Sequence, residues 1–150
     1  DLMRIITAQS MEYFSSRPKE NKQMILFCLD EFASFGKLQI TPALRRLRKR
    51  RIRILVLTQS VSDVDMIYGK DERIAMLGNF KFTVILGCKD TETQEYFSKM
   101  IGEKRSLLAT DPNQKRQPII KPADLAHLEQ DLFVICDDGA IRLRKNFYFK

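Results

Sequence analysis

Apolar residues gather in short continuous runs along the chain, and these runs predict strands. The run at 24–29 is apolar on both faces, as is typical of a strand in the middle of a parallel sheet. The β-branched run at 52–58 predicts a second strand, and Thr41-Pro42 between the runs is typical of an N-cap followed by the first residue of a helix. Strand, helix and strand within about 35 residues predict a right-handed crossover, so the two strands should be parallel.

The remaining hydrophobic and polar patterns predict elements on both sides of this unit. In chain order they indicate a helix over 2–14 with Leu2, Ile5 and Ile6 at helical spacing, a polar loop over 15–21, short helices over 60–68 and 71–77, a strand over 82–86, a helix over 91–101 with a Thr91–Gln94 capping box, a polar loop over 103–121, a short helix over 122–128, and strands over 132–136 and 140–143 around an Asp138-Gly139 turn. The predicted fold class is α/β, with a mainly parallel central sheet flanked by helices and a C-terminal antiparallel hairpin.

Composition indicates the size of the fold and the kind of partner. The 150 residues are 44% apolar and 30% charged, which suits one globular domain. The net charge of +7 favours an anionic partner, namely nucleic acid, nucleotide or a membrane surface. Cys28, Cys88 and Cys136 are predicted to be reduced core residues, and neither a signal peptide nor an apolar membrane span occurs. Because the chain starts within a predicted helix and without Met, we expect a fragment of a longer protein; an isolated small protein is the alternative.

Two adjacent carboxylates, Asp30 and Glu31, follow the first predicted strand. Ligands of α/β proteins gather at the carboxyl ends of parallel strands, and a carboxylate there can hold Mg²⁺, which prefers hard oxygen ligands. A following Glu can orient and deprotonate a water for attack on a γ-phosphate. This pattern predicts ATP hydrolysis. The alternative is that Asp30-Glu31 simply begins a solvated loop.

Gln59 follows the second predicted strand in the same way. If the two strands are neighbours, Gln59 lies beside Asp30 at one sheet edge, where a neutral amide can donate to a phosphate oxygen or hold a water. Otherwise Gln59 is an ordinary loop residue. His127, the single histidine, and the three cysteines lack the spacing of a metal site.

A dense basic cluster runs from the predicted helix into the start of the second strand. Its seven members are Arg45, Arg46, Arg48, Lys49, Arg50, Arg51 and Arg53. Because like charges repel, we expect most of them to meet an anionic partner, either DNA phosphates or a nucleotide bound to a neighbouring subunit. A charged, solvated helix face is the alternative.

The segment 29–38, Leu-Asp-Glu-Phe-Ala-Ser-Phe-Gly-Lys-Leu, closely resembles the Walker B region of conjugative coupling proteins, the TraG/TraD-like ATPases of type IV secretion. Further matches extend the resemblance over roughly residues 24–150. They are Arg48 before an apolar strand, Gln59-Ser60, Tyr68-Gly69, Asn79, Asp90-Thr91, Gly102, Pro122-Ala123-Asp124-Leu125 and Asn146-Phe147-Tyr148-Phe149.

The resemblance implies part of a RecA-like P-loop NTPase domain that uses ATP and Mg²⁺. It implies that Asp30 is the Mg²⁺-linked Walker B acid, Glu31 the catalytic carboxylate and Gln59 the γ-phosphate sensor. Arg48 falls where related proteins place an arginine finger that acts on a neighbouring subunit. Other arginines of the cluster can exchange roles with it.

The resemblance also implies a setting for the whole protein. Such proteins form a homo-hexamer at the cytoplasmic face of the bacterial inner membrane. They recruit relaxosome or relaxase proteins and drive single-stranded DNA and attached protein toward the type IV secretion channel.

One departure from the family pattern is large. No Gly-x-x-x-x-Gly-Lys-Ser/Thr loop occurs in the chain. We therefore expect residues 1–150 to be the C-terminal part of the motor domain, with the phosphate loop, a helical insertion and a membrane anchor upstream. Alone, the chain should bind ATP poorly and hydrolyse none. Two alternatives stay open: a chromosome-segregation or helicase-like translocase, and a non-catalytic docking module for relaxosome or effector proteins.

Overall fold

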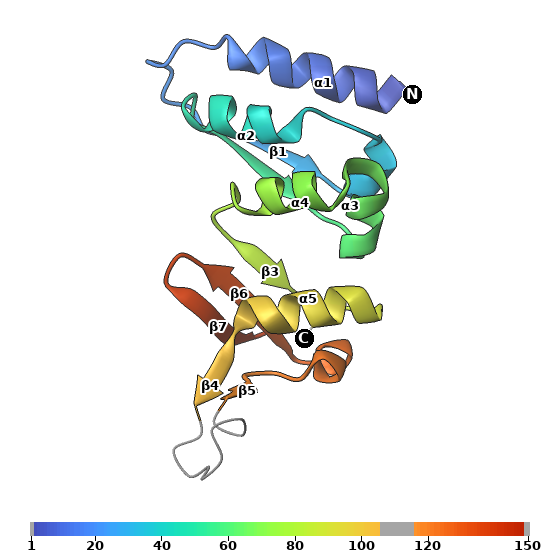
Figure 1. The fold of residues 1–150 in the computed structure, drawn as a ribbon. Helices are drawn as coiled ribbons and strands as arrows, with labels where there is room; N and C mark the ends of the chain where they lie inside the picture. The colour runs from blue at the N-terminus through green and yellow to red at the C-terminus, as the bar shows by residue number, and fades with distance from the viewer. Residues whose placement is uncertain (1, 106–115, 149–150) are drawn as a thin grey trace. The chain divides into compact units, whose positions relative to one another are not determined.

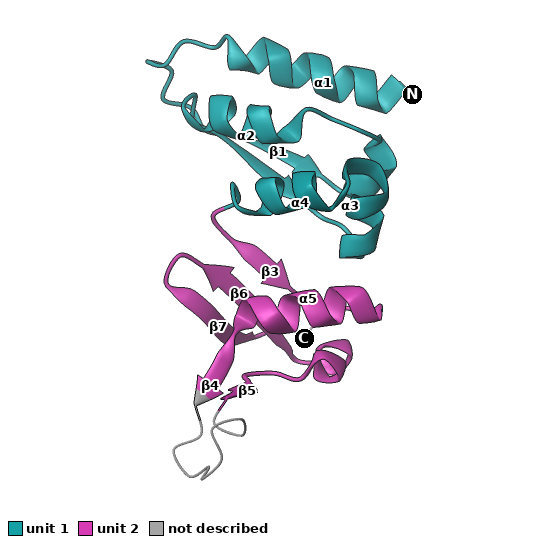
Figure 2. Cartoon of the chain, viewed as in Figure 1, with its two compact units in different colours: residues 1–80 teal, residues 81–150 magenta. Residues whose placement is uncertain are grey.

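The computed structural model describes residues 2–105 and 116–148, and the chain divides into two units. Unit 1 comprises residues 1–80 and unit 2 comprises residues 81–150 (Figure 2). Each unit has its own hydrophobic core and is described by itself.

Unit 1 contains the predicted strand–helix–strand crossover (Figure 1). Its elements are α1 (Leu2–Ser15), β1 (Ile25–Leu29), the 3-10 helix η1 (Phe32–Phe35), α2 (Ile40–Arg48), β2 (Ile52–Val56), α3 (Val61–Tyr68) and α4 (Lys70–Leu77). Strands β1 and β2 are parallel, with Ile25 opposite Ile52 and Leu29 opposite Val56. The predicted parallel pair is therefore confirmed, although α2 begins at Ile40, one residue before the predicted cap.

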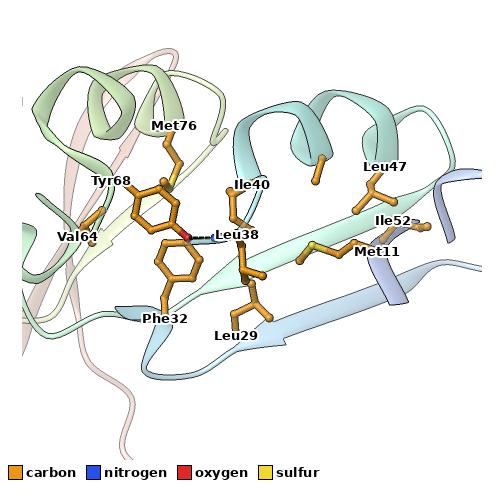
Figure 3. Packing of buried hydrophobic residues seen from close by; sticks show 11 residues of the cluster. Met11, Leu29, Phe32, Leu38, Ile40, Leu47, Ile52, Val64, Tyr68 and Met76 are labelled. Carbon is orange, nitrogen blue, oxygen red and sulfur yellow. Dashed lines mark hydrogen bonds between the residues drawn. The ribbon is translucent and has the colours of Figure 1, made fainter. Parts of the chain in front are cut away.

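One face of the β1–β2 pair carries the core of unit 1. Leu29 and Ile52 from the strands pack with Leu47 from α2 and Met11 from α1 (Figure 3). Helix α2 buries Ala43 and Leu47 and half-buries Leu44, because residues three and four apart share one face of a helix. The arginines of α2 are left on its outer side.

The opposite face of β1 corrects an expectation. We expected a strand buried on both faces, but Leu26 is 60% exposed and Cys28 is exposed. Leu55 on β2 shares this face. The core of unit 1 packs against the other face of the β1–β2 pair. A continuous apolar run therefore does not reveal which face of a strand is buried. The prediction of a core position is thus wrong for Cys28, whereas Cys88 is buried and Cys136 is half-buried.

Helix α1 is confirmed, but its buried face differs from the expected one. Leu2, Ile5 and Ile6 are exposed, and the buried residues are Thr7 and Met11. This helix carries apolar residues on more than one side, and the side that packs is the one whose Phe14 ring meets Phe27 of β1 at a centroid distance of 5.6 Å.

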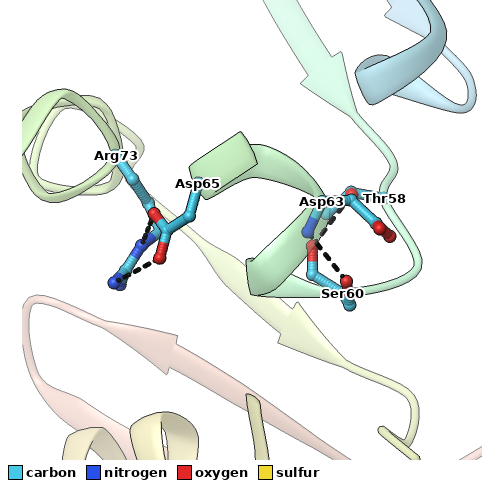
Figure 4. Close-up of polar contacts among 5 residues, drawn as sticks. All are labelled: Thr58, Ser60, Asp63, Asp65 and Arg73. Atoms are coloured by element: carbon cyan, nitrogen blue, oxygen red, sulfur yellow. Dashed lines mark hydrogen bonds and ion pairs between the residues drawn. The ribbon is translucent and has the colours of Figure 1, made fainter. Parts of the chain in front are cut away.

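Helices α3 and α4 are fixed by polar contacts that Figure 4 shows. Ser60 caps α3, since its Oγ accepts a hydrogen bond from the Asp63 N–H at 3.0 Å. Arg73 of α4 donates two hydrogen bonds to Asp65 of α3, at 2.7 and 3.2 Å. Both partners of this pair are largely shielded from solvent, so the charges are screened little.

Unit 2 is built on an antiparallel sheet. Its elements are β3 (Thr83–Ile85), α5 (Thr91–Ile101), β4 (Glu103–Arg105), β5 (Arg116–Pro118), the 3-10 helix η2 (Pro122–His127), β6 (Asp131–Cys136) and β7 (Gly139–Arg144). Strands β3, β6 and β7 pair antiparallel in that order, which confirms the predicted C-terminal hairpin. The core joins Ile85, Ile101, Leu125 and Phe133. Among the described residues, parallel pairing is confined to β1 and β2.

Two local predictions in unit 2 are wrong. The residue that caps α5 is Asp90, whose Oδ1 accepts from the Thr93 N–H at 2.9 Å, and not Thr91. Residues 103–121 were expected to be loop throughout, but β4 and β5 pair antiparallel with Glu103 opposite Pro118. The part of that prediction at 106–115 lies outside the described residues. Across 2–105 and 116–148, no helix is both long and apolar enough to span a bilayer.

Replacing a core residue of α2 tests this packing. Leu47 is 1% exposed, so Leu47→Ala should lower the free energy of unfolding by about 2–5 kcal/mol through lost burial and a residual cavity. Urea unfolding measures the change. Arg46→Ala on the same helix is the matched control: it removes only an exposed ion pair with Glu12 and should cost under about 1 kcal/mol. Equal losses in the two variants would contradict the assigned core face.

Candidate functional site

The register of the parallel pair brings Asp30 and Gln59 to one edge of the sheet. The Leu57 N–H donates to the Leu29 carbonyl at 3.0 Å, and the Phe32 N–H donates to the Leu57 carbonyl at 2.8 Å. These two bonds continue the pairing past the ends of β1 and β2. Asp30 therefore leaves β1 where Gln59 leaves β2, on adjacent strands and at the same edge. Both residues are exposed.

Glu31 has an uncommon backbone conformation. Its φ of 48° and ψ of 54° are left-handed, a region that few residues other than Gly, Asn and Asp adopt. The Asp30 Oδ1 accepts a hydrogen bond from the Glu31 N–H at 3.0 Å and so ties the two acids together. Backbone strain of this kind costs about 1–3 kcal/mol and clusters at functional sites. The sequence pattern did not predict it.

A cavity of about 370 Å³ lies against these carboxylates. It is lined by Met3 from α1, by Asp30 and Glu31, and by Ser34 and Phe35 from η1. It is a surface depression that is partly open to solvent, and not an enclosed pocket. The two acids thus border a space that a ligand can enter.

The turn that carries Gln59 is ordered by its neighbours. The Thr58 hydroxyl donates to the Ser60 carbonyl at 3.1 Å, and the Ser60 side chain caps α3 (Figure 4). Gln59 stands between them with its side chain exposed. The turn fixes the backbone of Gln59 and leaves its amide accessible.

Tyr68 at the end of α3 contacts the segment that follows Glu31. Its hydroxyl accepts from the Leu38 N–H at 3.0 Å (Figure 3) and also donates to the Gly36 carbonyl at 3.2 Å. Its ring stacks on Phe32, with centroids 5.3 Å apart and planes 11° apart. Burial raises the pKa of Tyr68 above its ordinary value of 10.0; the Leu38 hydrogen bond opposes the rise, and the charge of Glu72 adds to it. Sequence reasoning used Tyr68 only as the end of a helix and as part of a resemblance, and missed these contacts.

The basic cluster lies at the other end of the strands. The Arg51 carbonyl accepts from the Ile25 N–H at 3.3 Å, so the cluster meets the amino ends of β1 and β2. Strand β2 runs from Ile52 to Val56, about 17 Å at 3.3 Å per residue. Arg48 therefore does not join Asp30 and Gln59 within one chain.

Two members of the cluster have partners inside unit 1. Arg45 donates to the Asn79 side chain at 3.2 Å, and Arg46 pairs with Glu12 at 3.2 Å. No ion pair within the described part of the chain involves the other five members. Those five are Arg48, Lys49, Arg50, Arg51 and Arg53. Arginines at the end of α2 also complement the helix dipole, so part of the cluster has a structural role.

The donor set is consistent with a magnesium ion held partly by a ligand. In the described ranges no three His, Cys, Asp or Glu residues converge as a metal cage. Mg²⁺ is commonly bound by one or two carboxylates together with substrate phosphates, and not by an all-protein cage. Asp30, exposed beside the cavity, fits that arrangement.

Comparison with known proteins decides the family. The pattern of the family described as "TraM recognition site of TraD and TraG" matches residues 24–130. The chain belongs to this family. It is 28% identical to protein VirD4 of Agrobacterium fabrum over 166 residues, covering 99% of the chain and 25% of VirD4. It is 24% identical to the conjugal transfer protein TraG of the same organism, covering 95% of the chain and 24% of TraG.

Solved structures of the coupling protein TrwB have the same fold. A sulphate complex of TrwB superposes with a TM-score of 0.78 at 27% identity, covering 94% of this chain and 36% of TrwB. TrwB with ADP and Mg²⁺ has a TM-score of 0.75 at 26% identity, covering 97% and 36%. These likenesses confirm the partial RecA-like P-loop fold and the TraG/TraD-like assignment. The chain spans about a quarter of the length of the curated relatives it matches.

The raised pKa of Tyr68 predicts a pH dependence of stability. The unfolded chain releases this proton near pH 10, whereas the folded chain keeps it to higher pH, so stability is lost as pH rises above that value. The difference in unfolding free energy between wild type and Tyr68→Phe should be constant below about pH 9 and shrink toward about pH 11. Urea unfolding across this range measures it. A difference that stays constant to about pH 11 would show that the hydroxyl titrates alike in both states.

Proposed function

We propose that this chain is the C-terminal part of the motor domain of an ATP-driven coupling protein, which moves single-stranded DNA and attached protein into a type IV secretion or conjugation channel. Membership of the TraG/TraD family supports the setting. The observation that carries the chemistry is the convergence of Asp30 and Gln59 at one edge of adjacent parallel strands. TrwB, whose structures include complexes with ADP and Mg²⁺ and with an ATP analogue, supports the nucleotide class.

Each residue at this edge has a role that suits its chemistry. Asp30 would hold Mg²⁺, directly or through water, together with phosphate oxygens. The ion supplies charge neutralisation on the phosphates when it is bound. Glu31, beside the cavity, orients the attacking water and accepts its proton. Gln59 donates its amide N–H to the γ-phosphate and adds no charge.

The phosphate-binding loop is assigned to another part of the parent protein. The 150 residues contain no Walker A motif, and the relatives are much longer than this chain. A helix N-terminus and glycine backbone from that part would hold the phosphates against the edge described here. The chain alone is accordingly expected to bind ATP weakly and to hydrolyse none.

Arg48 is assigned to a neighbouring subunit's site. Its position at the amino ends of the strands separates it from Asp30 in the same chain. In a homo-hexameric ring, one subunit's basic end can face the acidic edge of the next, where an arginine finger stabilises charge on the transferring phosphoryl group. The remaining members, Lys49, Arg50, Arg51 and Arg53, are then candidates for DNA phosphates, together with Arg45 and Arg46 if their side-chain partners release them.

Membership of the family supports the proposed partners and location. The family description names recognition of TraM, which supports docking of relaxosome or relaxase proteins on this region. The channel of the secretion system would receive the cargo, with the parent protein held at the cytoplasmic face of the inner membrane by a segment outside these residues.

A docking module without catalysis is the second candidate. The family description and the lack of a phosphate loop in the chain favour it. The coupling-protein reading is preferred to the helicase-like alternative, because TraG is a conjugal transfer protein and TrwB a coupling protein. Hydrolysis of ATP by the full-length protein separates the motor from the docking module.

Glu31→Gln in the full-length protein should retain ATP and stall turnover. Loss of a general base typically lowers the rate by about 10²–10⁴-fold, while the amide keeps the size of the side chain. Single-turnover hydrolysis and nucleotide-binding assays measure the two effects. Glu20→Gln, an exposed change in a loop, is the matched control and should leave both unchanged. Undiminished hydrolysis in Glu31→Gln would remove this residue from the mechanism.

Arg48→Ala subunits mixed with Glu31→Gln subunits should recover ATPase activity that neither variant shows alone. In a mixed ring, a Glu31→Gln subunit still supplies Arg48 to the intact site of an Arg48→Ala neighbour, and the loss of such a finger can cost about 10³–10⁵ in rate. Steady-state hydrolysis across a range of mixing ratios measures the effect. Lys99→Ala, an exposed charge removal on α5, controls for net charge. Mixtures that recover no activity would contradict action between subunits.

A further inference from the structure

The Tyr68 side chain connects the segment that follows Asp30 to the helix that follows Gln59. From Asp30, the chain passes through η1 to the turn at 36–38. From Gln59, it passes through the Ser60 cap and along α3 to Tyr68. The two paths leave the edge separately, and the Tyr68 side chain joins them (Figure 3).

The Tyr68 side chain makes three separate contacts with the segment that follows Glu31. The hydroxyl bridges the Leu38 N–H and the Gly36 carbonyl, while the ring stacks on Phe32. Phe32 is fully buried, and its own N–H donates to the Leu57 carbonyl of the sheet. Glu31 is thus linked to Gln59 by a continuous series of contacts: Glu31 is bonded to Phe32, Phe32 stacks on Tyr68, and Tyr68 belongs to α3, which follows Gln59.

The far side of α3 is anchored as well. Asp65 pairs with Arg73 of α4, with both side chains largely buried. Lys37, in the bridged turn, pairs with Glu72 of α4 at 2.9 Å, although this pair is more exposed and therefore weaker. Contacts with α4 therefore hold α3 in place, and the Tyr68 hydroxyl of α3 in turn holds the turn at 36–38.

We propose that Tyr68 is a positioning residue that keeps Glu31 aligned with Gln59, so that the water and the γ-phosphate are presented at one geometry. This inference rests on the proposed function. Filling the core explains the ring, since a phenylalanine would fill the same space. It does not explain a hydroxyl that bonds both sides of the turn following Glu31. The left-handed backbone of Glu31 makes such support necessary, because a strained residue keeps its conformation only when its surroundings hold it.

Tyr68→Phe in the full-length protein isolates the hydroxyl, because it keeps the stacked ring. The expected result is a fall in kcat of about tenfold, the size expected from one or two ordinary hydrogen bonds, with the KM for ATP changed by less than about twofold. Amide hydrogen exchange should rise in the peptide covering residues 31–38. Two control variants accompany it. Ile52→Val removes a buried methyl group at the other end of β2, and Tyr13→Phe removes an exposed hydroxyl.

The controls separate positioning from general destabilisation. Ile52→Val should lower the melting temperature without changing kcat or the exchange of residues 31–38, and Tyr13→Phe should change none of these. If Tyr68→Phe keeps the wild-type kcat, or if Ile52→Val loses as much kcat as Tyr68→Phe, the positioning role is overturned. If Glu31→Gln is inactive while Tyr68→Phe is fully active, this inference fails and the proposed function stands. A wild-type protein without ATPase activity overturns both.

Discussion

The parallel pairing of β1 with β2 is the constraint on which the candidate site depends. Parallel strands connected by a helix place their carboxyl ends at one edge, and here two backbone hydrogen bonds extend that alignment to Leu57 and Phe32. Asp30 and Gln59 are thereby brought together from positions 29 residues apart in the chain, with no contact needed between their own side chains. The proposed roles of Asp30, Glu31 and Gln59 depend on this alignment.

Charge is separated along the same two strands. Acidic side chains occupy the carboxyl edge, and the basic cluster occupies the amino end, about 17 Å away along β2. One chain therefore presents an edge suited to a metal-bound nucleotide and an end suited to an anion, and cannot bring them together by itself. In the proposed motor, this polarity means that Arg48 can reach a nucleotide only on a neighbouring subunit. Arg45 and Arg46 have partners within unit 1, so they are weaker candidates than Arg48 for contacts outside it.

Sequence reasoning predicted the crossover well, because the apolar runs are local signals, but the predicted Thr41 cap is wrong, since α2 begins at Ile40 after Gln39. It also predicted the shared edge of Asp30 and Gln59, which follows from the crossover. It failed where burial depends on tertiary packing. Leu26 and Ile5 are apolar yet exposed, because periodicity does not say which face of an element is packed. The pair β4–β5 was missed because three polar residues carry no alternation. The left-handed Glu31 and the bonds of Tyr68 depend on contacts between distant residues, which no local pattern contains.

A structure of the full-length protein with Mg²⁺ and a non-hydrolysable ATP analogue would be the most direct measurement. The account predicts that the Asp30 carboxylate coordinates the ion, directly or through one water, and that the Gln59 amide lies about 3 Å from a γ-phosphate oxygen. A nucleotide bound away from the carboxyl ends of β1 and β2, with neither side chain near its phosphates, would contradict the account.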